Sequence, residues 1–264
     1  MTPSWAPHPP AYAGPSPAQL TRGEGLSAPS PRLRGEGRGE GLISVIIPAL
    51  NAADTLGHLL GILRACAEIK EVIVVDGGSS DDTVAVAGAA GAAVVEAQRG
   101  RGAQLRAGAA AAAGAWLLFL HGDCRLLAGW DRVVAAFLAA PQAADCAGYF
   151  DFALDDDAPA ARRLERIVAW RCRLFALPYG DQGLLISRPL YEAVGGFAPV
   201  PLMEDVELAR RLGRRRLARI GRGCVASARR YRREGYWLRP LRNLFCLSLY
   251  FTGLPPDRIA RLYG

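Results

Sequence analysis

The chain has 264 residues, 51% of them hydrophobic, which is enough to bury the core of one large domain or two small ones. Its formal net charge is +7, and every basic residue except Lys70 is an arginine, a bias that with abundant alanine and glycine suggests a GC-rich bacterial genome. No apolar run approaches the ~18 residues needed to cross a bilayer, so a protein built on membrane-spanning helices is excluded.

Six cysteines are scattered along the chain without a CxxC pair and without a secretory signal, so we expect reduced thiols in a cytoplasmic protein. From Arg210 to the end there are fifteen arginines against two acids, Glu234 and Asp257. This basic segment predicts phosphate groups or an anionic membrane surface as partners. The second case predicts peripheral contact with the inner face of the cell membrane, and no nucleic-acid partner is expected.

Residues 1–41 are rich in Pro, Gly, Ala and Ser and repeat RGEG three times without apolar periodicity. Such a segment cannot bury a core, and it lacks the charged start and apolar stretch of a signal peptide. We expect it to be either a mis-assigned start or a flexible tail. One domain at 42–264 is therefore predicted.

The first half of this domain, residues 42–125, alternates apolar strands with helices. The predicted elements are a strand at 43–47, a turn at 48–51, a helix at 53–67, a strand ending at Asp76, a helix at 82–90, a strand at 92–97, an Ala-rich helix within 98–114, and a strand at 116–120. Three of these strands end at polar loops that bear Asn51, Asp76 and Asp123. Because ligands gather beyond the carboxyl ends of parallel strands, the pattern predicts an α/β fold with one shared ligand edge.

The second half comprises an acceptor half at about 126–235 and a helical segment at about 236–264. The predicted elements are a helix at 130–140, an antiparallel strand at 147–154, a helix at 158–177, a loop at 180–183, the short strand LLIS, a helix that begins with Glu204 and Asp205, and a final amphipathic helical segment broken at Pro255 and Pro256. This final segment can either pack on the domain or dock on an anionic membrane.

Five motifs, IIPALN, VVDGGSSDDT, FLHGDC, YGDQG and MEDVEL, follow one another in the order seen in the GT-A glycosyltransferases of family 2. The resemblance spans residues 43–264 and looks closest to the bacterial radical-SAM/selenodomain-associated transferases. It implies a Rossmann-like GT-A fold with a mostly parallel mixed sheet flanked by helices. It also implies an inverting transfer from a nucleotide-sugar donor to an acceptor hydroxyl with Mg²⁺ or Mn²⁺.

The resemblance implies donor contacts at the first two strand ends. Asp76, with Gly77 beside it, resembles the residue that contacts the nucleoside, and the backbone from Pro48 to Asn51 resembles the part that flanks the base. Many relatives carry Glu after that Asn, where this chain has Ala52. The alternative is a plain turn that caps the next helix.

A metal site is implied at the third strand end. Asp123 resembles the second acid of the family's D-x-D motif, and a carboxylate there suits a cation that bridges the donor diphosphate. The first acid is replaced by His121, which either binds the metal or hydrogen-bonds the loop.

Two groups of arginines are candidates for the diphosphate, because guanidinium groups match phosphate oxygens bidentately. Arg106 is our main candidate in the first group, with Arg99 and Arg101 as alternatives, and solvated loop arginines are the competing interpretation. The second group lies where relatives place an Arg-aromatic motif and consists of Arg229, Arg230 and Arg232. The QxxRW motif of processive synthases is absent, which argues against polysaccharide synthesis.

Asp205 resembles the catalytic base of inverting members, and Glu204 would orient the acceptor or the base. The alternative is that both acids only complement a helix dipole. Asp181 and Gln182, between two glycines, resemble residues that contact the transferred sugar or the acceptor, which is either soluble or lipid-linked. Two rival functions remain, a nucleotidyltransferase and a non-catalytic module that binds nucleotide sugars or membranes.

Overall fold

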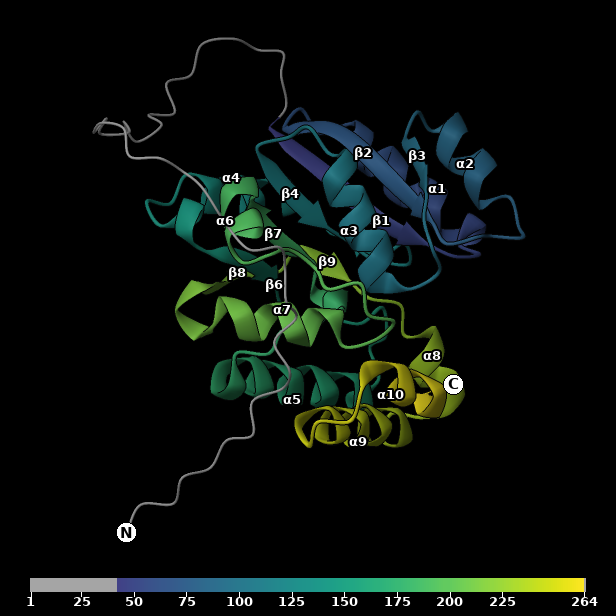
Figure 1. Ribbon diagram of the computed structural model, residues 1–264, viewed down its shortest axis with the longest axis vertical. Helices are drawn as coiled ribbons and strands as arrows, with labels where there is room; N and C mark the ends of the chain where they lie inside the picture. Colours follow the sequence, from purple (N-terminus) through teal and green to yellow (C-terminus); the bar gives the residue numbers. More distant parts are fainter. Residues whose placement is uncertain (1–41, 264) are drawn as a thin grey trace, which may run out of the picture. The chain divides into compact units, whose positions relative to one another are not determined.

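The structure, a computed structural model, describes residues 42–263, and the predicted tail at 1–41 lies outside the described residues. Its centre is a seven-stranded sheet in the order β3-β2-β1-β4-β7-β6-β8, beside a small two-stranded sheet of β5 and β9 (Figure 1). The strands are β1 (Ile43–Ala49), β2 (Ile69–Asp76), β3 (Ala93–Glu96), β4 (Trp116–Phe119), β5 (Arg125–Leu126), β6 (Ala147–Phe150), β7 (Leu184–Ser187), β8 (Leu217–Gly221) and β9 (Cys224–Val225).

The helices are α1 (Ala53–Arg64), α2 (Thr83–Ala89), α3 (Arg101–Ala111), α4 (Trp130–Leu138), α5 (Pro159–Phe175), α6 (Arg188–Ala193), α7 (Glu204–Leu212), α8 (Arg229–Glu234), α9 (Leu238–Phe251) and α10 (Pro256–Tyr263). None of the helices in this part of the chain is long and apolar enough to cross a membrane.

The sheet is buried on both faces, as the alternation along β1 shows. Val45 and Ile47 pack into a hydrophobic cluster that includes residues of α1, α2 and α4. Ile46, pointing to the opposite face, packs into a second cluster with residues of α3, α6 and α7. Successive strand residues point to opposite faces, so strands covered on both sides are apolar throughout. The predicted α/β fold with a mostly parallel sheet is confirmed.

The direction of β7 decides what meets at the ligand edge. β1 pairs in parallel with β2 and β4, so these strands end at one edge, as predicted. β7 is antiparallel to β4, with Phe119 opposite Leu184. The residues just before β7 therefore lie beside the residues just after β4.

The strand predicted at 147–154 is shorter, and its predicted antiparallel pairing is found on one side only. β6 covers only Ala147–Phe150, is antiparallel to β7 but parallel to β8, and is buried at all four positions. The pairing with β8 shifts its register between Tyr149 and Phe150, and a last backbone bond runs from the Asp151 N–H to the carbonyl of Gly221. The elements β5, β8, β9, α6 and α8 were not predicted from the sequence. These elements are short, and α8 (RRYRRE) has no apolar periodicity to find.

The predicted break of the C-terminal segment at Pro255 and Pro256 is confirmed by the division into α9 and α10. Cys246 and Leu247 of α9 and Ile259 of α10 pack into a cluster with Met203 and Val206 at α7. The segment therefore packs on the domain along one face, as the first of the two interpretations predicted.

Hydrogen bonds at the start of α1 connect the turn after β1 to the loop after β2. The Ala52 N–H donates to the Thr83 hydroxyl at 2.8 Å, and the Ala53 N–H donates to Asp81 at 3.2 Å. Side chains from the second loop thus supply the caps that the first turn of α1 lacks, since no side chain of its own caps it. In turn, the Thr83 hydroxyl donates to Asp81 at 2.5 Å.

We expect Thr83→Val to lower the free energy of unfolding by about 1–3 kcal/mol, because it leaves the Ala52 N–H without an acceptor at a fully buried side chain. Urea denaturation measures the change. Thr252→Val is the matched control, because the exposed Thr252 bonds only locally, to the carbonyl of Leu249, and its replacement should cost less than about 0.5 kcal/mol. Equal losses in the two variants would show that the loops do not depend on this contact.

Candidate active site at the sheet edge

Loops from both halves of the domain meet at the carboxyl edge of β1, β2 and β4. They are the turn Pro48–Asn51, the loop after Asp76, the loop after β4, the turn Gly180–Gln182 and the start of α7. A pocket lies between the last three, lined by His121, Tyr179, Gly180, Glu204 and Asp205, with an apolar floor that includes Phe119 and Leu105. Apolar walls with a few convergent polar groups are typical of small-molecule sites.

The two loops predicted to hold the nucleoside are fixed to each other. Asn51 has a positive φ of 51°, a conformation that asparagine tolerates better than most residues. Its N–H donates to the Ser79 hydroxyl at 3.0 Å, and its side-chain oxygen accepts from the Ser80 N–H at 2.8 Å. Pro48 precedes this turn as the penultimate residue of β1.

Asp76 is only 5% exposed, and its carboxylate accepts from the N–H groups of Gly78 and Ser79 and from the Ser79 hydroxyl. Burial acts to raise the pKa of this carboxyl, but the hydrogen bonds from Ser79 and Gly78 outweigh it, and the pKa is lowered. In the structure, Asp76 therefore orders its own loop. Its contact with a nucleoside stays a prediction.

Gln104 is a buried residue at this edge that the sequence analysis missed. Its side-chain N–H group donates to the carbonyls of Ala49 at 2.9 Å and Val75 at 2.8 Å, which ties the ends of β1 and β2 together. A Cβ on Gly77 would lie 3.0 Å from the same nitrogen, so the glycine makes room for this clamp. Only the ALN…VVDGG context, with a Gln in the helix after the third strand, could have suggested it.

His121 and Asp123 lie side by side, with 3.9 Å between His121 Nδ1 and Asp123 Oδ1. Burial, and the positive charges of Arg101 and Arg230, hold the pKa of His121 well below its usual range. The imidazole is therefore neutral at pH 7 and has a lone pair for a cation or a hydrogen bond. The Asp123 side chain is 44% exposed, so its carboxylate faces solvent.

Gly180 and Asp205 link the turn before β7 to the start of α7. The Gly180 N–H donates to Asp205 Oδ2 at 2.7 Å, while Asp205 Oδ1 accepts from the Val206 N–H at 2.7 Å. A Cβ on Gly180 would lie 2.8 Å from His121 Nε2. Met203, directly before the helix, has a φ of 68°, which sets the direction in which α7 begins.

Two further acids, Asp181 and Glu204, each have a buried oxygen without a hydrogen-bond partner in the described chain. Burial raises the pKa of Asp181 to about 6, helped by the charges of Asp205 and Asp123 and opposed by Arg171 and Arg101. Burial, with the Asp205 charge, also raises the pKa of Glu204. Such shifts are common where carboxyl groups take part in binding or proton transfer.

The arginines that lie near the pocket differ in part from those that we predicted. Arg101, at the start of α3, and Arg230 of α8 are the guanidinium groups whose charges act on His121. Arg106, our main candidate in the first group, lies on the exposed side of α3, where its charge acts on the phenol of Tyr191. The physical reason is helical spacing, because residues five apart on a helix point in different directions.

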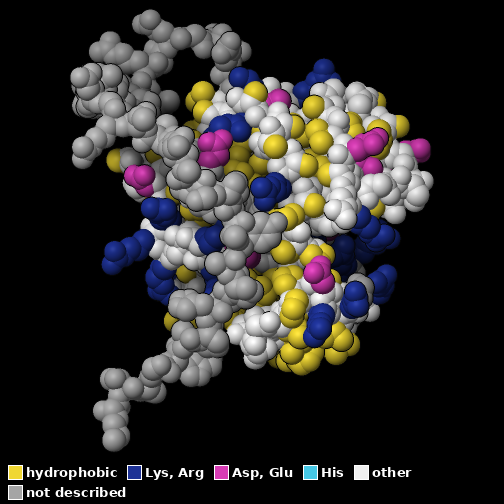
Figure 2. Space-filling view, in the orientation of Figure 1, with side chains coloured by type: hydrophobic (Ala, Val, Ile, Leu, Met, Phe, Trp, Pro, Cys, Tyr) yellow, Lys and Arg dark blue, Asp and Glu magenta, His cyan; other side chains and the backbone are white. Residues whose placement is uncertain are grey.

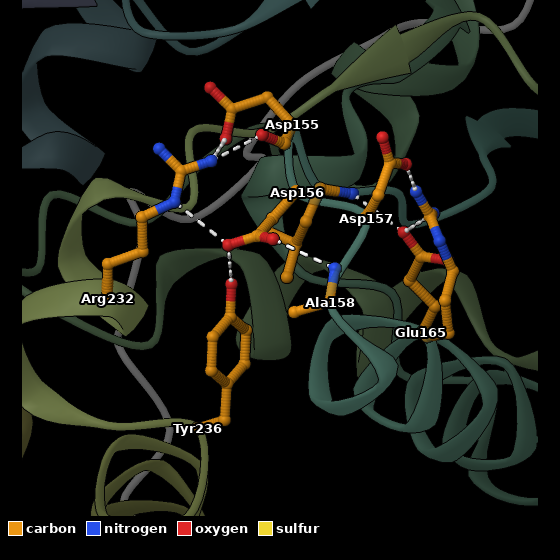
Figure 3. Close-up of polar contacts among 9 residues, drawn as sticks. Asp155, Asp156, Asp157, Ala158, Glu165, Arg232 and Tyr236 are labelled. Atoms are coloured by element: carbon orange, nitrogen blue, oxygen red, sulfur yellow. Dashed lines mark hydrogen bonds and ion pairs between the residues drawn. The ribbon is translucent and has the colours of Figure 1, made fainter.

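Arg232 binds the loop before α5 and does not contact the pocket. It donates to Asp156 at 2.8 Å and to the carbonyl of Asp155 at 2.6 Å, while the Tyr236 hydroxyl donates to the same Asp156 carboxylate (Figure 3). The hydrogen bonds from Tyr236 and Arg232 lower the pKa of Asp156. This network fixes α8, on which Arg229 is exposed and Arg230 acts on His121.

Gln182 points into the protein and not into the pocket. Its side chain is buried, donates to the Phe150 carbonyl at 2.9 Å and accepts from the Tyr179 N–H at 3.2 Å and from Arg171 at 3.3 Å. Its amide is thus occupied in holding the turn, unlike the sugar contact that we expected. Arg171 also stacks on the Tyr179 ring, with its guanidinium carbon 3.4 Å from the ring centre.

We expect the melting temperature of Glu204→Gln to rise relative to that of the wild type as the pH increases from about 5 to about 9. The folded chain holds the Glu204 proton to a higher pH than the unfolded chain does, because the pKa is raised. Folded-state stability is therefore lost as the pH rises, and glutamine avoids that loss. Melting curves across this range, with exposed Glu192→Gln as control, measure the trend. A constant difference would contradict a raised pKa.

Residues 44–201 match the family described as Glycosyl transferase family 2. Among curated proteins, glucosyl-3-phosphoglycerate synthase of Mycolicibacterium paratuberculosis (strain ATCC BAA-968 / K-10) is 36% identical over 92 residues. The matched part is 31% of this chain and 28% of that protein, so the chain matches less than a third of this relative's length.

Two solved structures have a similar fold. Glucosyl-3-phosphoglycerate synthase from Mycobacterium tuberculosis, in complex with Mn²⁺ and UDP-glucose, is 23% identical with a TM-score of 0.50, over 70% of this chain and 71% of that one. Mannosyl-3-phosphoglycerate synthase from Rubrobacter xylanophilus is 19% identical with a TM-score of 0.52, over 69% and 65% of the two chains. These likenesses show the fold, and the family match, which covers more than half of the chain, identifies it as a member of glycosyl transferase family 2.

Proposed function

We propose that this glycosyltransferase moves a hexosyl group from a nucleoside diphosphate donor to an acceptor hydroxyl with inversion. The observation that carries the proposal is that Asp205, Asp181 and His121 lie together at one edge of the sheet. The charge of Asp205 acts on Asp181, and its carboxylate accepts a hydrogen bond from the N–H of Gly180. Gly180 in turn packs against His121. The curated relative is a glucosyl-3-phosphoglycerate synthase, and the solved structure of the Mycobacterium tuberculosis synthase contains UDP-glucose, so UDP-glucose is the first donor to test. The motifs FLHGDC, YGDQG and MEDVEL support the radical-SAM/selenodomain-associated subgroup.

Asp205 is our proposed general base. Each of its oxygens accepts one backbone N–H, which leaves lone pairs to accept the proton of an attacking hydroxyl. Glu204, next to it, keeps its proton to a higher pH than an ordinary glutamate and can donate a hydrogen bond to the acceptor. Asp181 is the second candidate base, because a pKa of about 6 lies near the operating pH that favours proton transfer.

We propose Asp123 and His121 as the residues that would hold Mg²⁺ or Mn²⁺. One exposed carboxylate and one neutral imidazole suit a cation that takes its remaining ligands from a diphosphate and water. Residues 42–263 contain no group of three His, Cys, Asp or Glu that could bind a metal unaided. When bound, the cation neutralises charge on the departing diphosphate.

The remaining parts of the donor are proposed to bind to the other loops. Arg230, with Arg229 beside it and Arg101 opposite, is proposed to meet the diphosphate. The backbone from Pro48 to Asn51, with Asp76 and Gly77, is proposed to receive the nucleoside. We also propose a cytoplasmic location, which is supported by the six free cysteines, five of them buried.

A thermal-shift panel of UDP-, GDP-, ADP- and dTDP-sugars with Mn²⁺ tests the proposal, because a ligand present at 100 times its Kd stabilises by about 2.7 kcal/mol. We expect one donor class to raise the melting temperature and to be consumed once a hydroxyl acceptor is added. Soluble and lipid-linked compounds both belong in the acceptor panel. Stabilisation by a donor without any turnover would instead favour a binding module.

We expect Asp123→Ala to abolish the part of donor binding that depends on Mn²⁺, because the variant loses the carboxylate offered to the cation. Calorimetry with and without metal measures this, and a chelator should reproduce the effect in the wild type. Asp131→Ala, an exposed acid on α4, is the control. If donor affinity is the same with and without Mn²⁺ in every protein, the proposed metal role fails.

We expect Asp205→Asn to lower kcat by at least about 100-fold with little change in donor affinity, because an amide cannot take the acceptor's proton. Melting curves will also shift, since asparagine cannot accept from both Gly180 and Val206. Kinetics therefore decide the role. If turnover survives in Asp205→Asn and collapses in Asp181→Asn, with an acid limb near pH 6 in the wild type, Asp181 is the base.

A further inference from the structure

Helix α5 leaves an apolar stripe in solvent on the side away from its core contacts. Ile167, Trp170 and Leu174, spaced three and four residues apart, are 57%, 66% and 49% exposed. The opposite side of the helix is already packed, with Leu164 and Val168 in a cluster with β6. Residues three and four apart share one face of a helix, so these side chains form a continuous stripe.

Helix α9 shows the same division. Cys246 and Leu247 are buried against α7, whereas Trp237, Leu241 and Leu244 are 67%, 59% and 57% exposed. Packing on the domain therefore accounts for only one face of this helix. On the other face these three apolar side chains remain mostly in solvent.

The two stripes meet at one point, where the guanidinium carbon of Arg163 lies 6.0 Å from the centre of the Trp237 ring. Arg163 belongs to the α5 stripe, four residues before Ile167. Figure 1 shows α5 and α9 lying close to each other next to α10, and Figure 2 shows hydrophobic side chains and arginines gathered over this end. We call the surface the α5–α9 face, made of Ile167, Trp170, Leu174, Trp237, Leu241 and Leu244.

The exposed charged side chains of α5 next to this face are arginines. Arg163, Arg166 and Arg173 on α5 are exposed, and none of them has an acidic partner among residues 42–263. No Asp or Glu occurs in the two stretches that carry the face, 167–174 and 237–244. The nearest acids in sequence are already paired, Glu165 with Arg162 and Glu234 with Arg239 and Arg242. An apolar helical face that carries tryptophan, flanked by basic side chains, is the pattern that binds the headgroup region of anionic bilayers.

We propose that the α5–α9 face docks on an anionic membrane surface, with the tryptophans at headgroup depth and the arginines on lipid phosphates. A second copy of the chain fits less well, because a twofold contact puts the same patch on both partners. The arginines of one copy would then face those of the other with no acid in either stretch to pair with. This inference stands independently of the proposed glycosyl transfer.

Co-sedimentation of the full chain with vesicles tests the proposal. We expect binding to phosphatidylcholine vesicles that contain phosphatidylglycerol, weakened by about tenfold in high salt or with phosphatidylcholine alone. Trp170→Ser combined with Trp237→Ser should lose at least about tenfold in binding to the anionic vesicles, since the anchoring rings are gone. Val84→Ser, at a residue of α2 that is 42% exposed, is the matched control and should bind as the wild type does.

A conservative variant keeps the test valid if the serine variant does not fold. Trp170→Phe with Trp237→Phe keeps an apolar face and should still sediment, but the quenching of tryptophan fluorescence by brominated lipid should disappear. Absence of binding to every vesicle overturns the proposal, and so does quenching that survives in this variant. A lipid-free dimer that Trp170→Ser dissociates, seen by ultracentrifugation, would overturn it by showing that a second copy covers the face.

Discussion

The antiparallel pairing of β7 with β4 is the constraint on which the site depends. When a strand is antiparallel to its neighbours, the residues before it, and not those after it, lie at the edge where the neighbouring strands have their carboxyl ends. Phe119 opposite Leu184 therefore places the turn at Gly180 against the loop at His121. The turn fits only because Gly180 has no Cβ, and its N–H is held by Asp205. Three segments far apart in the chain become one site through these contacts.

The site also depends on a balance between its acidic side chains and nearby arginines. Asp123, Asp181, Glu204 and Asp205 lie close enough for their charges to act on one another, and such a group of acids is costly to ionise when buried. Arg101 opposes this cost at both Asp181 and Glu204, and Arg171 does so at Asp181. The acids therefore differ in what they can do. Glu204 keeps its proton to a higher pH and can donate a hydrogen bond, while an ionised carboxylate can only accept one.

The C-terminal helices combine support for the site with an outward surface. The contacts of Asp156 with Arg232 and Tyr236 anchor α8, the helix from which Arg230 acts on His121 (Figure 3). Next to it, α9 buries Cys246 and Leu247 but leaves Leu241 and Leu244 exposed. One basic segment therefore stabilises the pocket on one side and presents an apolar face on the other.

The sequence by itself determined which strands end at the shared ligand edge, because buried parallel strands are apolar runs and the polar residue after each run marks its end. It also named the candidate acids, since Asp123, Asp181, Glu204 and Asp205 lie in motifs that resemble those of family 2 glycosyltransferases. Only the tertiary structure decided how these residues are used. Whether Gln182 faced a ligand or the Phe150 carbonyl, and whether Arg101 or Arg106 faced His121, depended on strand direction and helix rotation. Both are fixed by contacts between segments distant in the chain, and local pattern does not record them.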